Sequence, residues 1–118
     1  MTADIRLFRL QDTPMSDYGD GPGSAGIARL IGPDSSQTMG AYFATFDGRS
    51  VPWTVRYDEI ILCLSGKFRL RTGEDVHELG PGDMLWIGNG TELRYEGEQA
   101  TVFIAIAPVD WRDRQPTA

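Results

Sequence analysis

Few side chains in this sequence have the type and setting that chemistry requires. The only histidine, His77, lies between Val76 and Glu78. The only cysteine, Cys63, lies within an apolar run, where a thiol behaves as a small hydrophobic side chain. The sequence contains neither a phosphate-binding glycine loop followed by lysine nor a serine or cysteine nucleophile elbow. Ionisable side chains on strands therefore remain as the candidates.

The strongest of these candidates is a carboxylate that follows Tyr57 and precedes an apolar stretch. Adjacent side chains on a strand face opposite sides, so Asp58 and Glu59 do not form a working carboxylate pair. A carboxylate facing an apolar interior must be paired or protonated, because burying an unpaired charge is costly. Glu59 is then either a catalytic acid, base or ligand anchor with a pKa tuned by burial, or a structural group satisfied by Tyr57, an arginine or the backbone.

A basic cluster forms the second candidate. Lys67, Arg69 and Arg71 alternate with Phe68 and Leu70, so on a strand their charges share one face. This pattern is typical of a solvated outer face, and an anion or substrate patch is the alternative. The chain as a whole has a net charge of −6. Because such a charge opposes binding to polyanions, we expect no nucleic-acid partner.

The length and composition predict one domain in the cytoplasm. A chain of 118 residues can bury most of its apolar surface around one core. No run of about eighteen apolar residues and no secretory signal are visible, so we expect no membrane partner. A lone cysteine cannot form an internal disulfide.

Apolar and polar residues alternate with a period of two along nearly the whole chain, and no window keeps an apolar stripe at helical spacing. Turn sequences such as Ser65-Gly66 and Gly80-Pro81-Gly82-Asp83 separate the apolar segments. Many short strands at this spacing predict an all-β sandwich or barrel. The expected strands are residues 5–10, 26–31, 39–46, 59–64, 67–71, 76–79, 84–87, 92–95 and 101–107.

The chain divides into three parts by composition. Residues 11–24 are rich in glycine and proline and poor in large apolar side chains, which predicts a loop: either a lid over a pocket or an ordinary surface excursion. We expect N-terminal strands and this loop in residues 1–36, packing on a barrel core at residues 37–111. Residues 112–118 are expected to be a polar tail.

Two glycine-punctuated blocks resemble the paired motifs of the cupin family. In the first block, Glu59 precedes Gly66 at the family's spacing, and in the second Gly82-Asp83 opens a segment that ends at Gly90. The resemblance implies a single-domain RmlC-like cupin, which is a double-stranded β-helix or jelly-roll barrel. Function is then expected in the barrel interior, where a small barrel can hold one small ligand.

The cupin metal ligands are missing from this sequence. By the resemblance, the family's three histidines would fall at Trp53, Val55 and Leu93, and none of these side chains can donate a lone pair to a metal. Only Glu59 keeps a ligand type at its position. We therefore expect no metal and no other cofactor, and oxygenase chemistry on bound iron is disfavoured.

A more specific resemblance comes from the run Val51-Pro52-Trp53-Thr54-Val55-Arg56-Tyr57-Asp58-Glu59-Ile60 and the later Pro108-Val109-Asp110-Trp111. Together with the Gly-Asp turn between them, these segments resemble the cupin domain of the ethanolamine-utilization protein EutQ family over roughly residues 40–111. Full-length members carry an additional amino-terminal region. The resemblance implies ethanolamine or acetate metabolism, and for the family an acetate kinase activity and an association with the bacterial microcompartment have been proposed.

If Trp53, Val55 and Glu59 take the family's inward positions, the pocket is an aromatic and aliphatic wall with a carboxylate set into it. Trp53 then offers a stacking or cation–π surface, or packs in the core. A one-residue bulge would reverse any assignment made by strand parity. The candidate ligand-binding side chains are Trp53, Tyr57, Tyr42, Tyr95, Lys67 and Arg69, with Glu59 as the catalytic or anchoring group.

Two functions of different classes remain open. One is a metal-independent cupin that binds or acts on a small polar metabolite in the barrel. The other is a non-catalytic binding or assembly module whose barrel is filled by its own side chains. Residues 59–64 are apolar on both faces of their strand, so we also expect a homodimer whose interface covers the outer face.

Overall fold

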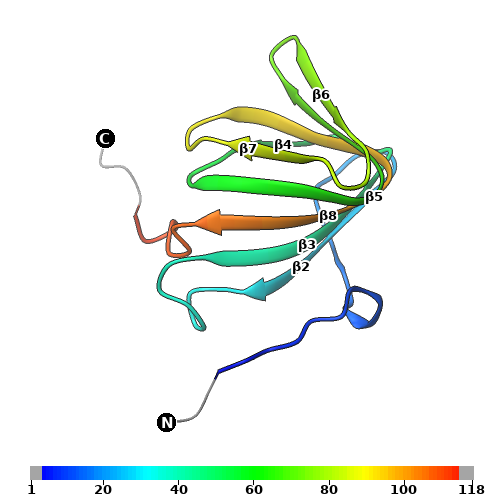
Figure 1. Ribbon diagram of the computed structural model, residues 1–118. Helices are drawn as coiled ribbons and strands as arrows, with labels where there is room; N and C mark the ends of the chain where they lie inside the picture. The colour runs from blue at the N-terminus through cyan, green and yellow to red at the C-terminus, as the bar shows by residue number, and fades with distance from the viewer. Residues whose placement is uncertain (1–3, 115–118) are drawn as a thin grey trace.

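Alternating side chains along eight strands build one curved antiparallel sheet that closes into a barrel (Figure 1). The computed structural model describes residues 4–114. Its elements are η1 (Leu10–Asp12), β1 (Ser16–Asp17), β2 (Ser24–Ile31), β3 (Gly40–Asp47), β4 (Val51–Thr54), β5 (Asp58–Thr72), β6 (Asp75–Leu79), β7 (Met84–Ile87) and β8 (Glu92–Ala107). The all-β prediction is confirmed.

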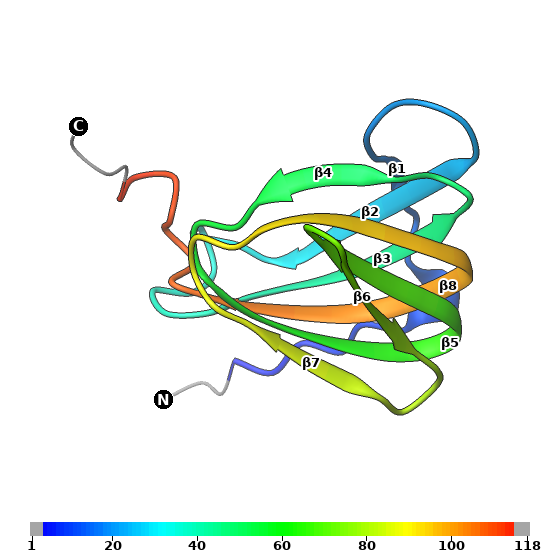
Figure 2. The ribbon, with the colours of Figure 1, turned by 90° about the horizontal axis from the view of Figure 1, so that it is seen from above.

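The sheet order is β1-β2-β3-β8-β5-β6, with β4 paired to β8 and β7 paired to β5. Figure 2 shows β4 and β7 on opposite sides of the barrel. The β5–β6 hairpin projects beyond the barrel in Figure 1. Within residues 4–114, no helix is long and apolar enough to cross a membrane.

An aromatic cluster lies in the buried core of the barrel. Phe46 and Phe68 are almost fully buried, with ring centroids 5.6 Å apart, and Tyr95 packs 5.7 Å from Phe46. Ala44 and Ile61 fill the space between neighbouring strands and have no exposed surface. Burying each large apolar side chain contributes roughly 1.5–3 kcal/mol, so this cluster is a packed core.

The two longest strands correct the predicted boundaries. Residues 59–64 and 67–71 form one strand, β5, and residues 92–95 and 101–107 form one strand, β8. Ser65-Gly66 is therefore not a hairpin turn. The β5–β8 pairing shifts register on both sides of Ser65, and Gly66 has φ of 73°. A Cβ at Gly66 would overlap the carbonyl oxygen of Gln99, so only glycine allows β5 and β8 to lie this close together at the bulge.

The prediction of a strand at residues 5–10 is wrong. These residues pair with no strand and lead into η1, with Ile5 and Leu7 largely exposed. Their apolar alternation lacks a partner strand within the described chain. Strand β4 was not predicted, because Pro52 interrupts a segment that is too short to show clear alternation. In the structure β4 pairs with β8, with Val51 opposite Tyr95 and Thr54 opposite Glu92.

Candidate functional site

A cavity of about 610 Å³ opens next to the aromatic cluster, and Tyr95 belongs to both. The inner faces of β2, β3, β4, β5 and β8 surround it, and residues 18–21 and the C-terminal segment form its rim. The walls combine aliphatic and aromatic surfaces with a few hydroxyl and charged groups, which is the usual composition of a small-molecule site. Its lining includes Tyr18, Asp20, Arg29, Tyr42, Ser50, Pro52, Trp53, Tyr57, Glu59, Arg94, Tyr95, Trp111 and Arg112.

Glu59 is the buried acid of this cavity, with only 1% of its surface exposed. It points inward from β5, where its backbone lies opposite Ile87 of β7 and Ile106 of β8. The Tyr95 hydroxyl lies 2.8 Å from Oε1 and 3.0 Å from Oε2 and donates to the carboxylate. Among residues 4–114, no lysine, arginine or histidine forms an ion pair with Glu59.

This environment changes the acidity of Glu59. Burial raises the pKa of its carboxyl group from 4.5 to about 7, and the hydrogen bond from Tyr95 lowers it only in part. At neutral pH the group is therefore present in both protonation states. An acid with a pKa near the working pH can donate and accept a proton efficiently, and it can also bind either a hydrogen-bond acceptor or a cation.

An aromatic wall stands beside this acid. The Trp53 indole nitrogen donates a hydrogen bond of 2.9 Å to the Tyr57 hydroxyl, which keeps its own proton for a second partner. The Trp111 ring packs edge-on at 5.7 Å from Trp53 and 5.4 Å from Tyr57. Burial and the charge of Glu59 raise the pKa of Tyr57, so it stays a neutral hydrogen-bonding group.

Two more tyrosines reach the cavity from other elements. Burial raises the pKa of Tyr18 to about 12 and also raises the pKa of Tyr42, so both remain protonated at neutral pH. Arg29, on the inner side of β2 opposite Tyr42 of β3, brings a positive charge to the same wall. Sequence analysis missed Tyr18 and Arg29. It had noted Trp111 only as part of a terminal motif.

Of the predicted site residues, the structure brings together Glu59, Trp53, Tyr57, Tyr42 and Tyr95 in one cavity. It does not bring Lys67 or Arg69 there. Both point outward. Arg69 lies 3.0 Å from Glu98, and Lys67 lies 3.8 Å from Glu78.

The register shifts around Ser65 explain this correction. Up to Cys63, odd-numbered residues of β5 face inward, whereas beyond the shifts Phe68 and Leu70 do. The side chains of the basic cluster therefore lie on the outer face of β5 and not in the cavity.

The four positions of the cupin metal site do not fit a metal. Trp53 and Glu59 border the cavity, while Val55 and Leu93 belong to the buried core. One carboxylate beside an indole N–H donor and two aliphatic side chains supplies no converging donor set. Within residues 4–114, no three His, Cys, Asp or Glu side chains gather as a metal site, and His77 is exposed on β6.

One arginine fixes the rim that sequence analysis treated as a loop or lid. The Arg49 side chain is only 11% exposed and pairs with Asp17 at 3.2 Å. It also donates hydrogen bonds of 2.9–3.4 Å to the carbonyl oxygens of Tyr18, Gly19, Gly21, Pro22 and Gly23. Charge-assisted hydrogen bonds from one rigid guanidinium hold the segment in a single conformation. Residues 18–21 are therefore positioned as part of the cavity wall.

Comparison with known proteins gives a consistent assignment. The family model described as "Ethanolamine utilisation protein EutQ" matches residues 7–113. The chain is 27% identical over 95 residues to the Acetate kinase EutQ of Escherichia coli (strain K12), a match that covers 80% of this chain and 41% of that protein. The chain thus spans about two fifths of the length of this curated relative.

Solved structures show the same fold. The crystal structure of an ethanolamine utilization protein EutQ from Salmonella typhimurium LT2 superposes with a TM-score of 0.79 at 23% identity, covering 89% of this chain and 87% of that one. An RmlC-like cupin with a double-stranded β-helix fold from Methanocaldococcus jannaschii gives a TM-score of 0.71 at 9% identity, covering 98% of this chain and 99% of that one. The predicted cupin fold is confirmed.

Proposed function

The chain belongs to the ethanolamine utilisation protein EutQ family, and from this premise we propose that its barrel binds a small polar metabolite of ethanolamine or acetate metabolism. In this proposal Glu59 is the group that exchanges a proton with the metabolite or anchors it. Trp53 and the cavity tyrosines supply its apolar and hydrogen-bonding walls.

The observation that supports this function is an open cavity around a buried acid that has no cationic partner in the described chain. A non-catalytic assembly module would be expected to fill its barrel with side chains, whereas this barrel combines a packed core with an open cavity. Perturbed acids in open pockets are typical of functional sites. The open cavity around Glu59 therefore favours a ligand-handling protein over a purely structural module.

The acetate kinase activity in the names of the curated relatives belongs to proteins nearly twice the length of this chain. Phosphoryl transfer depends on groups that position phosphates and magnesium. The cavity is lined by two acids, Glu59 and Asp20, by four tyrosines and by three arginines. Within residues 4–114 no three His, Cys, Asp or Glu side chains gather that could hold magnesium, so we limit the proposal to binding and proton exchange on a small metabolite. Titration with ATP tests the wider activity directly.

Calorimetric titration with ethanolamine, acetate and ATP tests the proposal. Glu59→Gln keeps the size of the side chain and removes its charge, and we expect it to weaken binding of the metabolite by about tenfold or more. Asp58→Asn is the matched control, because Asp58 faces outward and accepts a hydrogen bond from the Asn89 backbone amide at 3.1 Å. Equal losses in both variants, or no loss in Glu59→Gln, would contradict the role of Glu59.

The pH dependence of binding identifies the ligand class. Ethanolamine is a cation at neutral pH and pairs with ionised Glu59, so its affinity should increase as the pH rises through about 7. Acetate accepts a hydrogen bond from protonated Glu59, so its affinity should increase as the pH falls through the same range. A flat pH profile for every ligand that binds would place recognition on groups other than Glu59.

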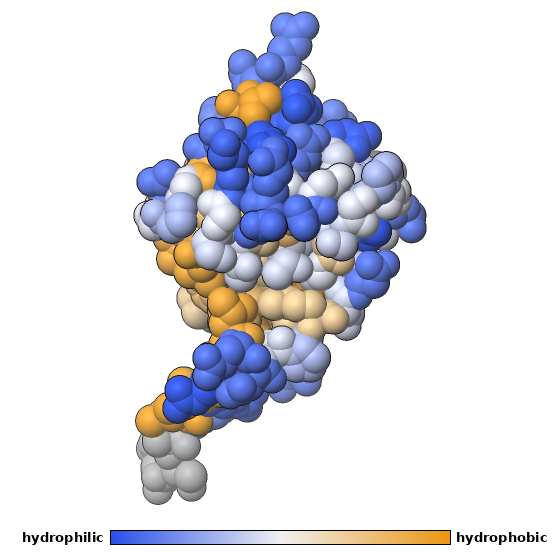
Figure 3. All heavy atoms as spheres, turned by 90° about the vertical axis from the view of Figure 1, so that its right-hand side faces the viewer, coloured by the Kyte–Doolittle hydropathy of each residue, from blue (hydrophilic) through white to orange (hydrophobic). Residues whose placement is uncertain are grey.

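We also propose that two copies associate through the outer face of β5 and β7. Ile60 and Leu64 of β5 and Met84 and Trp86 of β7 expose apolar surface there, with Trp86 64% exposed. Figure 3 shows hydrophobic residues reaching the surface below a hydrophilic upper half of the face it views. Light scattering at micromolar concentration should give twice 13.1 kDa, and Trp86→Lys should shift it to the monomer mass. A monomer mass for the unaltered chain would contradict this.

A further inference from the structure

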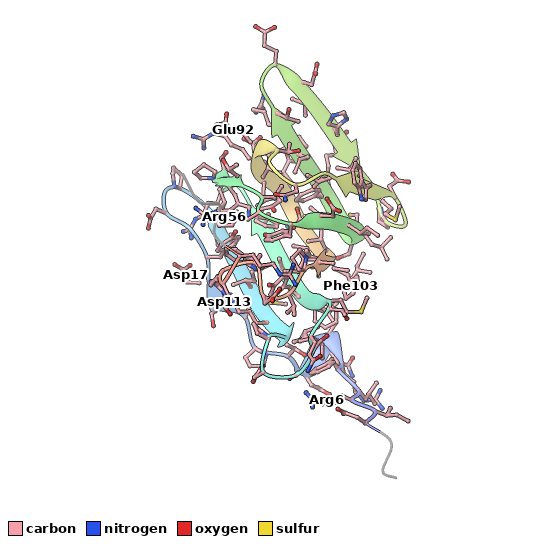
Figure 4. The ribbon with its side chains drawn as sticks, turned by 90° about the vertical axis from the view of Figure 1, so that its left-hand side faces the viewer. Arg6, Asp17, Arg56, Glu92, Phe103 and Asp113 are labelled. Carbon is pink, nitrogen blue, oxygen red and sulfur yellow. The ribbon has the colours of Figure 1, made fainter. Side chains whose placement is uncertain are left out.

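A second hollow, about 680 Å³ in volume, lies outside the barrel beside β4, and we call it the arginine groove. Its lining includes Pro52, Thr54, Arg56, Arg71, Glu92 and Arg94. In Figure 4 the labelled Arg56 and Glu92 lie on the same side of the barrel. β4 forms the wall between the groove and the cavity. The charged lining consists of three guanidinium groups and one carboxylate, in a protein whose net charge is −6.

The pairing of β5 with β8 explains why positive charge gathers in the groove. On the outer face, Lys67 lies opposite Glu98 and Arg69 lies opposite Glu96. Oppositely charged residues that face each other in this way stabilise a sheet. One step further along the same ladder the rule is broken, because Arg71 lies directly opposite Arg94. Two like charges at facing positions destabilise a sheet unless something compensates them.

The side chains compensate for only one of these two arginines. Arg71 reaches back along the ladder to Glu96, with Nη2 3.2 Å from Oε1. Arg94 donates instead to the neutral Ser50 hydroxyl at 3.2 Å, and the same hydroxyl donates to Glu96 at 2.7 Å. Among residues 4–114, no carboxylate lies within 4.0 Å of the Arg94 guanidinium.

From this arrangement we propose that the arginine groove binds the phosphate group of a small phosphorylated ligand, held by Arg71, Arg94 and Arg56. A guanidinium offers paired N–H donors that match phosphate oxygens, and a dianionic group between Arg71 and Arg94 relieves their repulsion. The apolar edge of Pro52 and the Thr54 side chain then contact the body of the ligand. The groove shares Pro52 and Arg94 with the cavity around Glu59 but lies on the other side of β4 from Glu59, and phosphate binding there does not depend on the function proposed for the cavity.

Pyrophosphate, inorganic phosphate and acetate are the probes, titrated by calorimetry and by chemical-shift mapping of the backbone amides. Pyrophosphate should bind most tightly and acetate most weakly, with shifts concentrated at residues 52–54, 71–73 and 92–94. Arg71→Gln and Arg94→Gln should each weaken pyrophosphate binding by about tenfold. Arg69→Gln is the control, because it removes the same charge from the same ladder at a position outside the groove.

Three results would overturn the proposal. Equal weakening in all three variants would show general attraction to the basic face rather than a site. Acetate binding as tightly as pyrophosphate would show that the groove does not select phosphate. Absence of binding to pyrophosphate up to about 10 mM would show that it holds no anion of this class. Thermal unfolding of each variant confirms that the losses of binding come from folded protein. The Glu59→Gln variant leaves the groove intact and should bind pyrophosphate normally.

Discussion

Two glutamates on paired strands experience opposite electrostatic environments. Glu59 lies inside the barrel, where burial raises its pKa to about 7 and Tyr95 offsets this only in part. Glu96 lies on the outer face. Burial acts there to raise its pKa as well, but hydrogen bonds from Ser50 and Arg71 and the positive charges of Arg71 and Arg69 outweigh it, and the pKa is lowered.

The difference between the two glutamates lies in their partners on the outer face and in the cavity. On the outer face, carboxylates have cations within reach, so their charges support the fold. In the cavity, Glu59 accepts a hydrogen bond from Tyr95 but forms no ion pair with any residue of 4–114, so its charged form is disfavoured in the folded protein. A fold selected only for stability would replace such a group with an apolar one, which supports our proposal that a ligand completes the interactions of Glu59.

The largest expected effect is on the pH dependence of stability. Because the folded pKa of Glu59 is about 7 and the ordinary value is 4.5, folded protein binds this proton more tightly than unfolded protein does. The stabilisation is fully present below about pH 4.5 and is lost as the pH rises through 7, by up to roughly 3 kcal/mol. Chemical unfolding of wild type and Glu59→Gln between pH 4.5 and 8.5 measures it.

In that series the stability of wild type relative to Glu59→Gln should fall as the pH rises, since the amide does not titrate. Asp58→Asn should follow wild type and serves as the control. A constant difference across the range would mean that Glu59 keeps an ordinary pKa, and the contrast with Glu96 would then disappear.

A smaller effect should follow when the donor to Glu59 is removed. Tyr95→Phe keeps the ring that packs against Phe46 and deletes the hydroxyl. The ionised carboxylate then loses a hydrogen bond, so stability at pH 8 should fall by about 1–2 kcal/mol and less at pH 5. The pKa of Glu59 should move above 7, which the infrared band of the protonated carboxyl group reports directly. An unchanged band position and titration would show that Tyr95 does not tune the acid.

Much of the fold was predictable from local pattern. Alternation identified the segments that became β2, β3, β6 and β7, and glycine punctuation placed several of the turns between them. The errors come from information that is not local. Ser65-Gly66 has the composition of a turn, but here the glycine allows β5 to pass close to Gln99 of β8. Only the position of the partner strand distinguishes a bulge from a turn.

The same bulge also limited how many site residues could be predicted from the sequence. Strand parity and the family resemblance placed Glu59, Trp53 and Tyr57 correctly, because these residues precede the register shifts. Parity failed for Lys67 and Arg69, which follow them. Tyr18, Arg29 and Trp111 could not be assigned by any local pattern, because the closure of the barrel brings them to Glu59 from distant segments.

The smallest expected effect concerns Glu96, the glutamate on the outer face. The lowered pKa of Glu96 means that its contribution is present at neutral pH and is lost as the pH falls through its folded value, the opposite sign to Glu59. Glu96→Gln should therefore destabilise the protein at pH 7 and not in strong acid, by about 0.5–1 kcal/mol, because its partner Arg71 is 44% exposed and solvent screens the pair. Since screening increases with ionic strength, the loss should shrink further in 1 M salt, whereas the loss in Tyr95→Phe, deep in the barrel, should not. Urea unfolding of both variants at low and high salt makes this comparison. Equal salt dependence would mean that the interior acid is as accessible to solvent as the exterior one, which contradicts the buried position of Glu59.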